Sequence, residues 1–309
     1  MAGVDWGAIR QARFGDRNHQ ALPKQILLPV LPKGLTEFLR KADDPEVSPA
    51  ALAETIENDA ALTCELLKHA NSSQFGLRRK ASSAQQALSL LGVRQTKLLL
   101  ITAGTRMATA SRQSRLINLR NFWNANLERA LFAREIAVLL KADPDVAFAA
   151  GMLQDFLLPA LTNELLPDYT RFLDMQARNA TDLSQFERQT FGWTHAQAGA
   201  SMMSDWGFPD ELVCCILVHH EGLPVLCDTT LGRTAAAAVA ISSLVPDALR
   251  QVPGGLEQLV KLAELWPSFD LERTARSVDE QFRSAAQGQP HDFSLLHRLE
   301  RSGLLTPAS

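Results

Sequence analysis

Three histidines and one aspartate are the residues of this sequence best suited to metal or acid–base chemistry. His195, His219 and His220 fall within a helix-rich stretch, and Asp155 is the carboxylate to consider beside them. Imidazole nitrogens and carboxylate oxygens that converge on a divalent ion lower the pKa of bound water, which makes a nucleophile for phosphoester hydrolysis. No short-range motif such as HExxH fixes a convergence, so spacing alone favours surface or helix-terminal histidines.

Charge and cysteine content exclude several other classes of protein. The 31 Lys and Arg against 34 Asp and Glu give a formal charge of -3, which offers no field for a polyanion, so nucleic acid is not an expected partner. The cysteines form no CxxC pair and are expected to be reduced, mostly buried thiols: Cys64, Cys214, Cys215 and Cys227. Neither a signal peptide nor a membrane span of roughly 20 apolar residues is recognisable, so a cytoplasmic location is expected.

The elements that must position these residues are predicted to be helices throughout. Apolar residues recur at intervals of three and four, and only 6% aromatic residues leave little material for a sheet. Ser48 followed by Pro49 predicts a helix start, and Asp59 predicts the start of a second helix, so the two form a helical hairpin. The expected fold is an all-α, multi-helix bundle.

Gly, Pro, Asn and Asp residues, which commonly begin or end helices, predict the remaining helices and the domain organisation. Further helices are expected at 84–91, 94–107, 120–140, 145–156, 183–189, 195–206, 209–219 and 231–244. We expect an N-terminal extension over 1–19, one domain over 20–250 with halves at about 20–110 and 115–250, and a C-terminal helical extension over 251–309. The extension is expected to cover the helical core with apolar residues, namely Leu256, Val260, Leu262 and Leu265.

A turn in the N-terminal half is a second candidate binding surface. Short polar side chains at a helix end, a glycine for a tight turn and a basic run follow one another there: Asn71, Ser72, Phe75, Gly76, Arg78, Arg79 and Lys80. Capping of the helix end explains the polar residues and is favoured over ligand contact. A solvated loop is favoured for the basic run, with a phosphate-bearing ligand or an acidic partner left as alternatives.

Two ordered sets of short motifs resemble the HDOD domain over about residues 20–245. The first set is LPVLP at 28–32, DP at 44–45 with Ser48, residues 56–59, ANS at 70–72, FG at 75–76, Ser83, Ala87 and LG at 91–92. The second set is AGMLQD at 150–155, HAQAGA at 195–200, WGFP at 206–209 and HH at 219–220. The resemblance implies an all-helical scaffold related to HD-type metal-dependent phosphohydrolases.

Compared with the metal ligands of HD-type phosphohydrolases, the set in this sequence is expected to be incomplete. The leading histidine is replaced within residues 123–126, with Ala125 the best alignment, and the His-Asp doublet has become Gln154 and Asp155. The closing aspartate is expected to be absent, because residues 231–244 contain no acidic side chain. Alanine has no donor atom, and a glutamine amide is a poor ligand beside imidazole or carboxylate.

We therefore predict neither a catalytic residue nor a bound metal or other cofactor. The remnant pocket is expected to comprise Gln154, Asp155, His195, His219 and His220. These residues most simply serve as hydrogen-bonded core groups, while weak binding of one ion is left open.

The predicted function is that of a non-catalytic signal-transduction or regulatory module, of a bacterial type, that binds protein partners. One alternative is a metal-dependent phosphohydrolase or phosphodiesterase acting on a nucleotide. It would need other carboxylates to complete the ligand set, for which Glu128, Glu164 and Glu221 are available. Another alternative is a sensor that binds a nucleotide without hydrolysing it.

Overall fold

The computed structural model describes residues 4–14, 29–71, 80–110, 114–285 and 294–304. Within these ranges every regular element is helical, which confirms the all-α prediction. The first helices are α1 (Trp6–Phe14), α2 (Lys33–Ala42), α3 (Pro49–Glu57), α4 (Ala60–Ala70), α5 (Ala84–Ala110), α6 (Leu119–Leu140) and α7 (Pro144–Leu153). They are followed by α8 (Leu158–Glu164), α9 (Leu166–Arg178), α10 (Leu183–Phe191), α11 (His195–Asp205), α12 (Asp210–Val218), α13 (Ala235–Ser242), α14 (Gly255–Leu265), α15 (Leu271–Ala285) and α16 (Leu295–Arg301).

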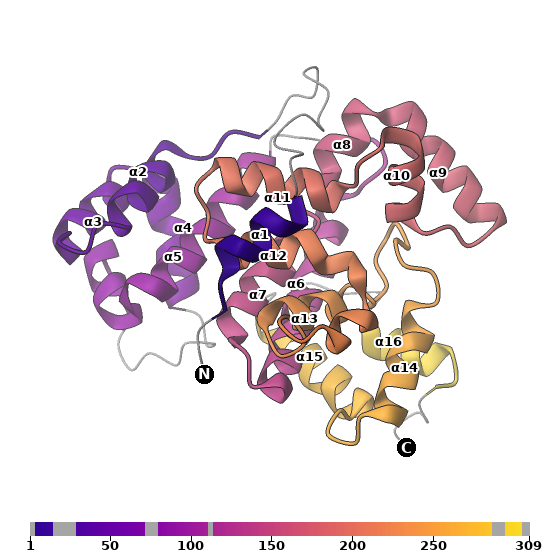
Figure 1. Cartoon of the computed structure of the whole chain (residues 1–309). Helices are drawn as coiled ribbons and strands as arrows, with labels where there is room; N and C mark the ends of the chain where they lie inside the picture. Colours follow the sequence, from indigo (N-terminus) through magenta and orange to yellow (C-terminus); the bar gives the residue numbers. More distant parts are fainter. Residues whose placement is uncertain (1–3, 15–28, 72–79, 111–113, 286–293, 305–309) are drawn as a thin grey trace.

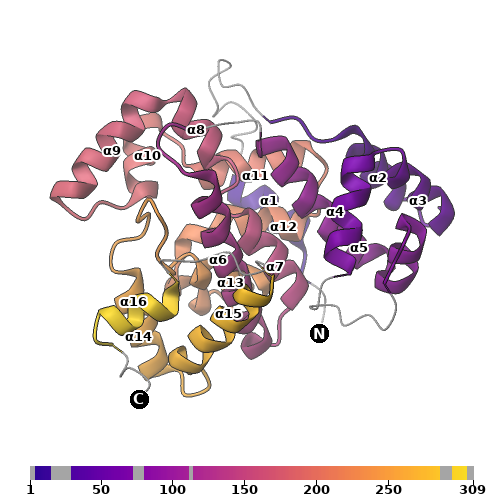
Figure 2. The ribbon, with the colours of Figure 1, turned by 180° about the vertical axis from the view of Figure 1, so that it is seen from behind.

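The helices gather around a central group formed by α6, α7, α12 and α13 (Figure 1). Helices α2 to α5 form one wing, α8 to α10 project at a second corner, and α14 to α16 lie at a third (Figures 1 and 2). One connected hydrophobic core runs through all these groups, from Leu31 to Leu299. The alanine-rich α13 is buried along its whole length, and its small side chains let α6, α7 and α12 pack around it.

Side-chain capping explains why the predicted helical hairpin forms. The Ser48 hydroxyl accepts a hydrogen bond from the Ala51 N–H at the start of α3, and Asp59 accepts one from Leu62 at the start of α4. Each bond satisfies a backbone donor that the first helical turn leaves unpaired. The break predicted between 84–91 and 94–107 lies inside α5, where Gly92 has a φ of 78°.

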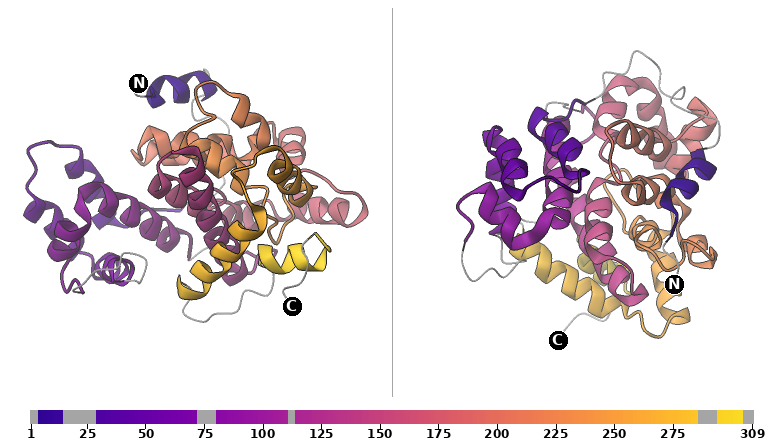
Figure 3. Two further views of the ribbon diagram at one scale, coloured as in Figure 1. Left: turned by 90° about the horizontal axis from the view of Figure 1, so that it is seen from below. Right: turned by 60° about the vertical axis from the view of Figure 1, so that its left-hand side comes forward.

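Helices α1, α2, α8 and α9 were not predicted from the sequence. No side-chain hydrogen bond caps α2, α8 or α9, so the signal that located other helix starts is missing. Helix α1 buries none of its residues and lies on the outside of the molecule against α12 (Figure 3). Its apolar side chains Trp6, Ile9 and Phe14 are only partly buried against the core. Arg10 and Arg13 add ion pairs to residues of the main body.

The close approach of α6 and α7 depends on a glycine. A Cβ atom built on Gly151 would lie 2.8 Å from the Cα atom of Ala130, closer than real side chains approach a backbone. Arg129 precedes Ala130 on α6, and Asp155 follows the end of α7. The small residues at this contact therefore bring the arginine beside the aspartate.

One residue of the C-terminal extension is not buried as expected. Leu265 is 72% exposed at the end of α14, although Leu262 is buried and both Leu256 and Val260 pack against the core. The apolar face of α14 is therefore narrower than the spacing suggested, and α15 also contacts the core through α6.

The cysteines were expected to be mostly buried, and only two are. Cys214 and Cys215 lie in the buried part of α12, whereas Cys64 and Cys227 are exposed. All four are free thiols. Among the described helices, none combines the length and the apolar character needed to cross a bilayer.

Candidate functional site

Four side chains from three parts of the fold converge in the centre of the molecule. Asp155 follows α7, His195 is the first residue of α11, and His219 and His220 occupy the short 3-10 turn after α12. One ligand atom from each residue lies within 4.8 Å of the others. We call these four residues the tetrad.

Hydrogen bonds outside the tetrad orient two of its imidazole rings. Nδ1 of His195 lies 2.7 Å from Oε2 of Glu187, and Nδ1 of His219 lies 2.6 Å from the Ile216 carbonyl oxygen. Both partners are acceptors, so each Nδ1 carries the proton and each Nε2 points to the centre. This arrangement is typical of metal-ligating histidines.

Distances within the tetrad are compatible with one divalent ion. Nε2 of His195 lies 3.2 Å from Oδ1 of Asp155, 3.3 Å from Nε2 of His219 and 2.9 Å from Nε2 of His220. The Oδ1 atom of Asp155 is also 3.4 Å from Nε2 of His219. A tetrahedral ion with bonds of about 2.0–2.1 Å separates its ligand atoms by roughly 3.3 Å. The tetrad therefore fits a single ion.

The other oxygen of Asp155 is occupied by an arginine. Nη1 of Arg129 lies 2.6 Å from Oδ2 of Asp155, and its Nη2 lies 2.7 Å from Oδ2 of Asp247. The carbonyl oxygens of Ser243 and Val245 accept further bonds from the same guanidinium. The Arg129 side chain is 1% exposed, so a fixed positive charge lies in the interior against the tetrad.

Gln251 completes the surroundings of Asp155. Its Nε2 donates to Oδ2 of Asp155 over 2.9 Å, so this oxygen accepts from both an amide and a guanidinium. Oδ1 accepts no hydrogen bond by strict geometry and faces the histidines. The two oxygens of one carboxylate thus have different environments, one closed by donors and one open to the tetrad.

Charges and burial shift the pKa values of the tetrad. Burial disfavours a charged His195, but the carboxylates of Glu187 and Asp155 outweigh it and raise its pKa to about 10. Burial lowers the pKa of His219 and, together with the nearby imidazoles, holds that of His220 well below its usual range. Burial alone would raise the pKa of Asp155, but the neighbouring His195 and His219, together with the charge of Arg129, hold it well below its usual range. A charged His195 donates its Nε2 proton towards Asp155, and a bound cation would displace that proton.

Gln154, the fifth residue of the expected pocket, precedes Asp155 in the chain and is buried. Neither its amide nitrogen nor its amide oxygen has a hydrogen-bond partner among the described residues. Ala125 lies one helical turn before Arg129 on α6. No described ligand atom therefore comes from either position.

The expected absence of an acidic residue from the alanine-rich helix applies to α13, but a carboxylate enters the site just beyond it. Asp247 lies five residues after the end of α13 and is only 6% exposed. It binds Arg129 and not the tetrad. The carboxylates proposed to complete the ligand set, Glu128, Glu164 and Glu221, are not members of the cluster either.

The turn in the N-terminal half is not brought to this centre. Asn71 ends α4, where its side chain accepts from the Ala81 N–H over 2.7 Å and donates to the Ala81 carbonyl over 2.8 Å. This pair of bonds ties the end of α4 to Ala81. Ser72, Phe75, Gly76, Arg78 and Arg79 lie outside the described residues.

Sequence reasoning missed the residues that surround the tetrad. They are Arg129, Glu187, Asp247 and Gln251. A signal existed for Arg129, because it falls on the buried face of α6 in register with Phe122, Asn126 and Ala133. A cation at such a position needs buried carboxylates. Nothing in the sequence identifies which carboxylates they are.

Solved structures share this architecture over most of their length. A proposed phosphohydrolase from Shewanella amazonensis SB2B aligns with a TM-score of 0.64 at 21% identity, covering 85% of this chain and 95% of that one. An HDOD domain protein of unknown function from Geobacter sulfurreducens aligns with a TM-score of 0.60 at 20% identity, covering 90% of each chain. A proposed signal transduction protein from Marinobacter aquaeolei VT8 gives 0.57 at 18% identity, covering 93% and 66%. At these identities the likeness establishes the fold.

Sequence comparison supplies the family. An uncharacterised protein of Treponema pallidum (strain Nichols) is 25% identical over 199 residues, which are 63% of this chain and 38% of that protein. The chain thus spans well under half of that relative. The sequence profile of the HDOD domain matches residues 28–222, more than half of the chain and all four members of the tetrad. The chain belongs to the HDOD domain family.

Proposed function

We propose that the chain is a non-catalytic regulatory module in signal transduction, acting by binding partners on an HD-like scaffold. The observation that carries the proposal is the buried pair of Arg129 and Asp155. A two-metal hydrolytic centre needs a second cation beside its bridging carboxylate, to stabilise the attacking and leaving oxygens. Here the chain supplies that charge itself, with a guanidinium, which has no open coordination position.

The tetrad can still hold one ion, which fits a structural role. Asp155, His195, His219 and His220 would be its ligands. A divalent ion there supplies positive charge that joins the end of α7, the start of α11 and the turn after α12. Four protein ligands fill a tetrahedral site, whereas catalytic zinc sites keep one position for water or substrate. The number of ligands therefore favours stabilisation over hydrolysis.

Family membership supports a signalling role, and one observation supports the enzyme alternative. The convergence of three Nε2 atoms and a carboxylate oxygen is what a metal-dependent phosphohydrolase would use. That alternative requires an ion with at least one exchangeable position. It also requires hydrolysis that depends on Asp155.

A hydrolysis assay on the full chain separates the two functions. We expect purified protein incubated with Mn²⁺, Fe²⁺ or Zn²⁺ to cleave bis-p-nitrophenyl phosphate and cyclic nucleotides no faster than its Asp155→Asn variant does. Asp174→Asn, at an exposed position of α9, is the matched control. Turnover that Asp155→Asn and His220→Ala abolish and Asp174→Asn leaves unchanged would overturn the proposal. Circular dichroism melts establish that each variant is folded.

A further inference from the structure

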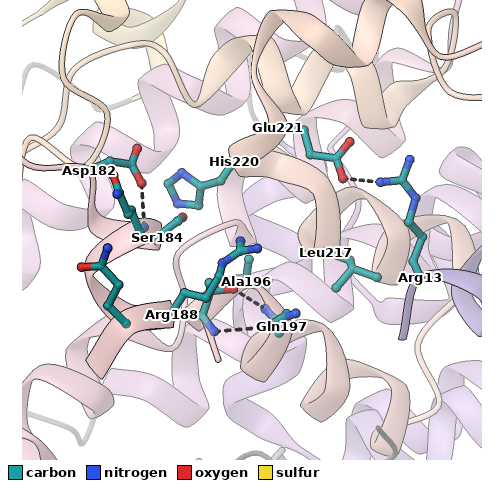
Figure 4. Close-up of a pocket in the computed structure, with 12 residues that line it drawn as sticks. Arg13, Asp182, Ser184, Arg188, Ala196, Gln197, Leu217, His220 and Glu221 are labelled. Carbon is teal, nitrogen blue, oxygen red and sulfur yellow. Dashed lines mark hydrogen bonds and ion pairs between the residues drawn. The ribbon is translucent and has the colours of Figure 1, made fainter. Parts of the chain in front are cut away.

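A cavity of about 530 Å³ opens beside the tetrad. Its walls come from the first turns of α10 and α11, from the turn after α12 and from α1 (Figure 4). His220 is the one tetrad residue that lines it. The volume lies within the range of about 300–1,000 Å³ that is typical of small-molecule sites.

Two helix N-termini meet at this cavity. Ser184 and Ala196 are the second residues of α10 and α11, and both line the wall. Their neighbours in the first turns donate to Asp182, Glu187 and Thr194, but no described residue accepts from the N–H of Ser184 or Ala196. Unpaired amides and the positive end of each helix dipole favour an anion.

Buried polar atoms at the inner end of the cavity give a second and independent indication of a ligand. Ser184 is 8% exposed, yet its hydroxyl has no hydrogen-bond partner among the described residues. Nδ1 of His220 is likewise buried without a partner there. Figure 4 shows the Ser184 side chain pointing towards His220. Buried polar groups in native proteins are almost always satisfied, so these atoms indicate a bound group.

One cationic side chain at the cavity forms no ion pair with a described residue. Asp182 accepts from the Gln185 N–H as the cap of α10, and Glu221 is paired with Arg13. Arg188 is exposed on the wall and forms no ion pair with any described residue. Asp182 keeps its negative charge as a helix cap, so the attraction for an anion comes from the Arg188 guanidinium together with the two helix N-termini.

From these observations we infer that the cavity binds a small phosphate monoester of the size of a nucleoside monophosphate. The phosphate lies against the N-termini of α10 and α11 and is held by Arg188 and Ser184. The exposed amides of Gln185 and Gln189 face the organic part. The inference rests on the proposed function in one respect, namely that the ester acts as a regulatory ligand and leaves unchanged.

Titration calorimetry on the full chain tests the site, with inorganic phosphate, AMP and GMP as probes. We expect the nucleotides to bind, phosphate to compete, and Arg188→Gln to weaken binding by about 10-fold to 100-fold, the loss of a hydrogen bond to a charged group. Ser184→Ala should weaken binding by about fivefold, as a neutral hydrogen bond would. Arg178→Gln, also an exposed arginine at a helix, is the matched control and should bind as the wild type does.

The outcomes for this site differ from those for the proposed function. No heat with any probe at millimolar concentration, or equal affinities for Arg188→Gln and wild type, would overturn the inference and leave the non-catalytic role standing. Binding that depends on Arg188, accompanied by release of phosphate from AMP or GMP, would support the site and contradict the non-catalytic role.

Discussion

Two arginines of this protein each bridge two carboxylates, one in the interior and one at the surface. Arg129 joins Asp155 and Asp247, and its side chain is 1% exposed. Arg13 joins Glu221 and Asp228, and its side chain is 34% exposed. The chemical groups are alike, but the surroundings give them different consequences.

Burial makes the inner bridge indispensable once it is formed. Water cannot replace a lost partner in the interior, so removal of Arg129 would leave Asp247 without its ion-pair partner and Asp155 with the charge of His195 alone. Arg13 holds the outer helix α1 against residues that water can solvate in its absence. The inner arginine is therefore part of the core, whereas the outer one is an attachment at the surface.

The largest expected effect is that of Arg129→Met. We expect it to lower the free energy of unfolding by about 3–5 kcal/mol, as breaking one side of a buried ion pair does. The triple variant with Asp155→Asn and Asp247→Asn should regain part of this loss, because the unpaired charges are gone. Urea unfolding measures both. A loss below about 1 kcal/mol for Arg129→Met would mean that water or a bound cation reaches the carboxylates.

A change at the contact between α6 and α7 should have a smaller effect on the same bridge. Gly151→Ala places a Cβ against the backbone of Ala130, so the helices must separate. We expect a loss of about 1–3 kcal/mol in unfolding free energy, the usual cost of overpacking. Thermal unfolding followed by circular dichroism gives the value. Helix propensity alone would make Gly151→Ala more stable by about 1 kcal/mol, so an unchanged or increased stability would contradict the close contact.

The smallest expected effect is that of Arg13→Ala. We expect a loss of about 0.2–1 kcal/mol, because the pair is partly exposed and screened by water and salt. The difference from wild type should shrink further at 1 M salt. Urea unfolding at two salt concentrations checks this. A loss as large as that of Arg129→Met would show that α1 is integral to the core. The buried and the surface arginine would then not differ in their contribution to stability.

The hairpin of α3 and α4 was predictable because its start signals are local. Ser48 and Asp59 cap helices through bonds to residues three positions away, which a single sequence displays. The start of α2 has no such cap, so it left no comparable signal. Helices α8 and α9 also lack a side-chain cap, whereas α12 and α13 lack one and were still predicted from their apolar residues.

For the site, the types of the tetrad residues were predictable, but their surroundings were not. The spacing of His195 and His219 cannot show that the two rings face each other, because this depends on how α11 and α12 pack. Asp247 reaches Arg129 across 118 positions of the chain. Contacts of that range follow from tertiary packing. The one indication in the sequence was that Arg129 falls among the apolar residues on the buried face of α6.

We propose that the interior holds at most one metal ion, because Arg129 provides the second positive charge. Elemental mass spectrometry of the full chain, after incubation with Mn²⁺, Fe²⁺ or Zn²⁺ and removal of the excess, tests it most directly. We predict no more than one ion per chain, and any bound ion should be lost in His195→Ala. Two ions per chain, both dependent on Asp155, would contradict the claim and restore a hydrolytic centre.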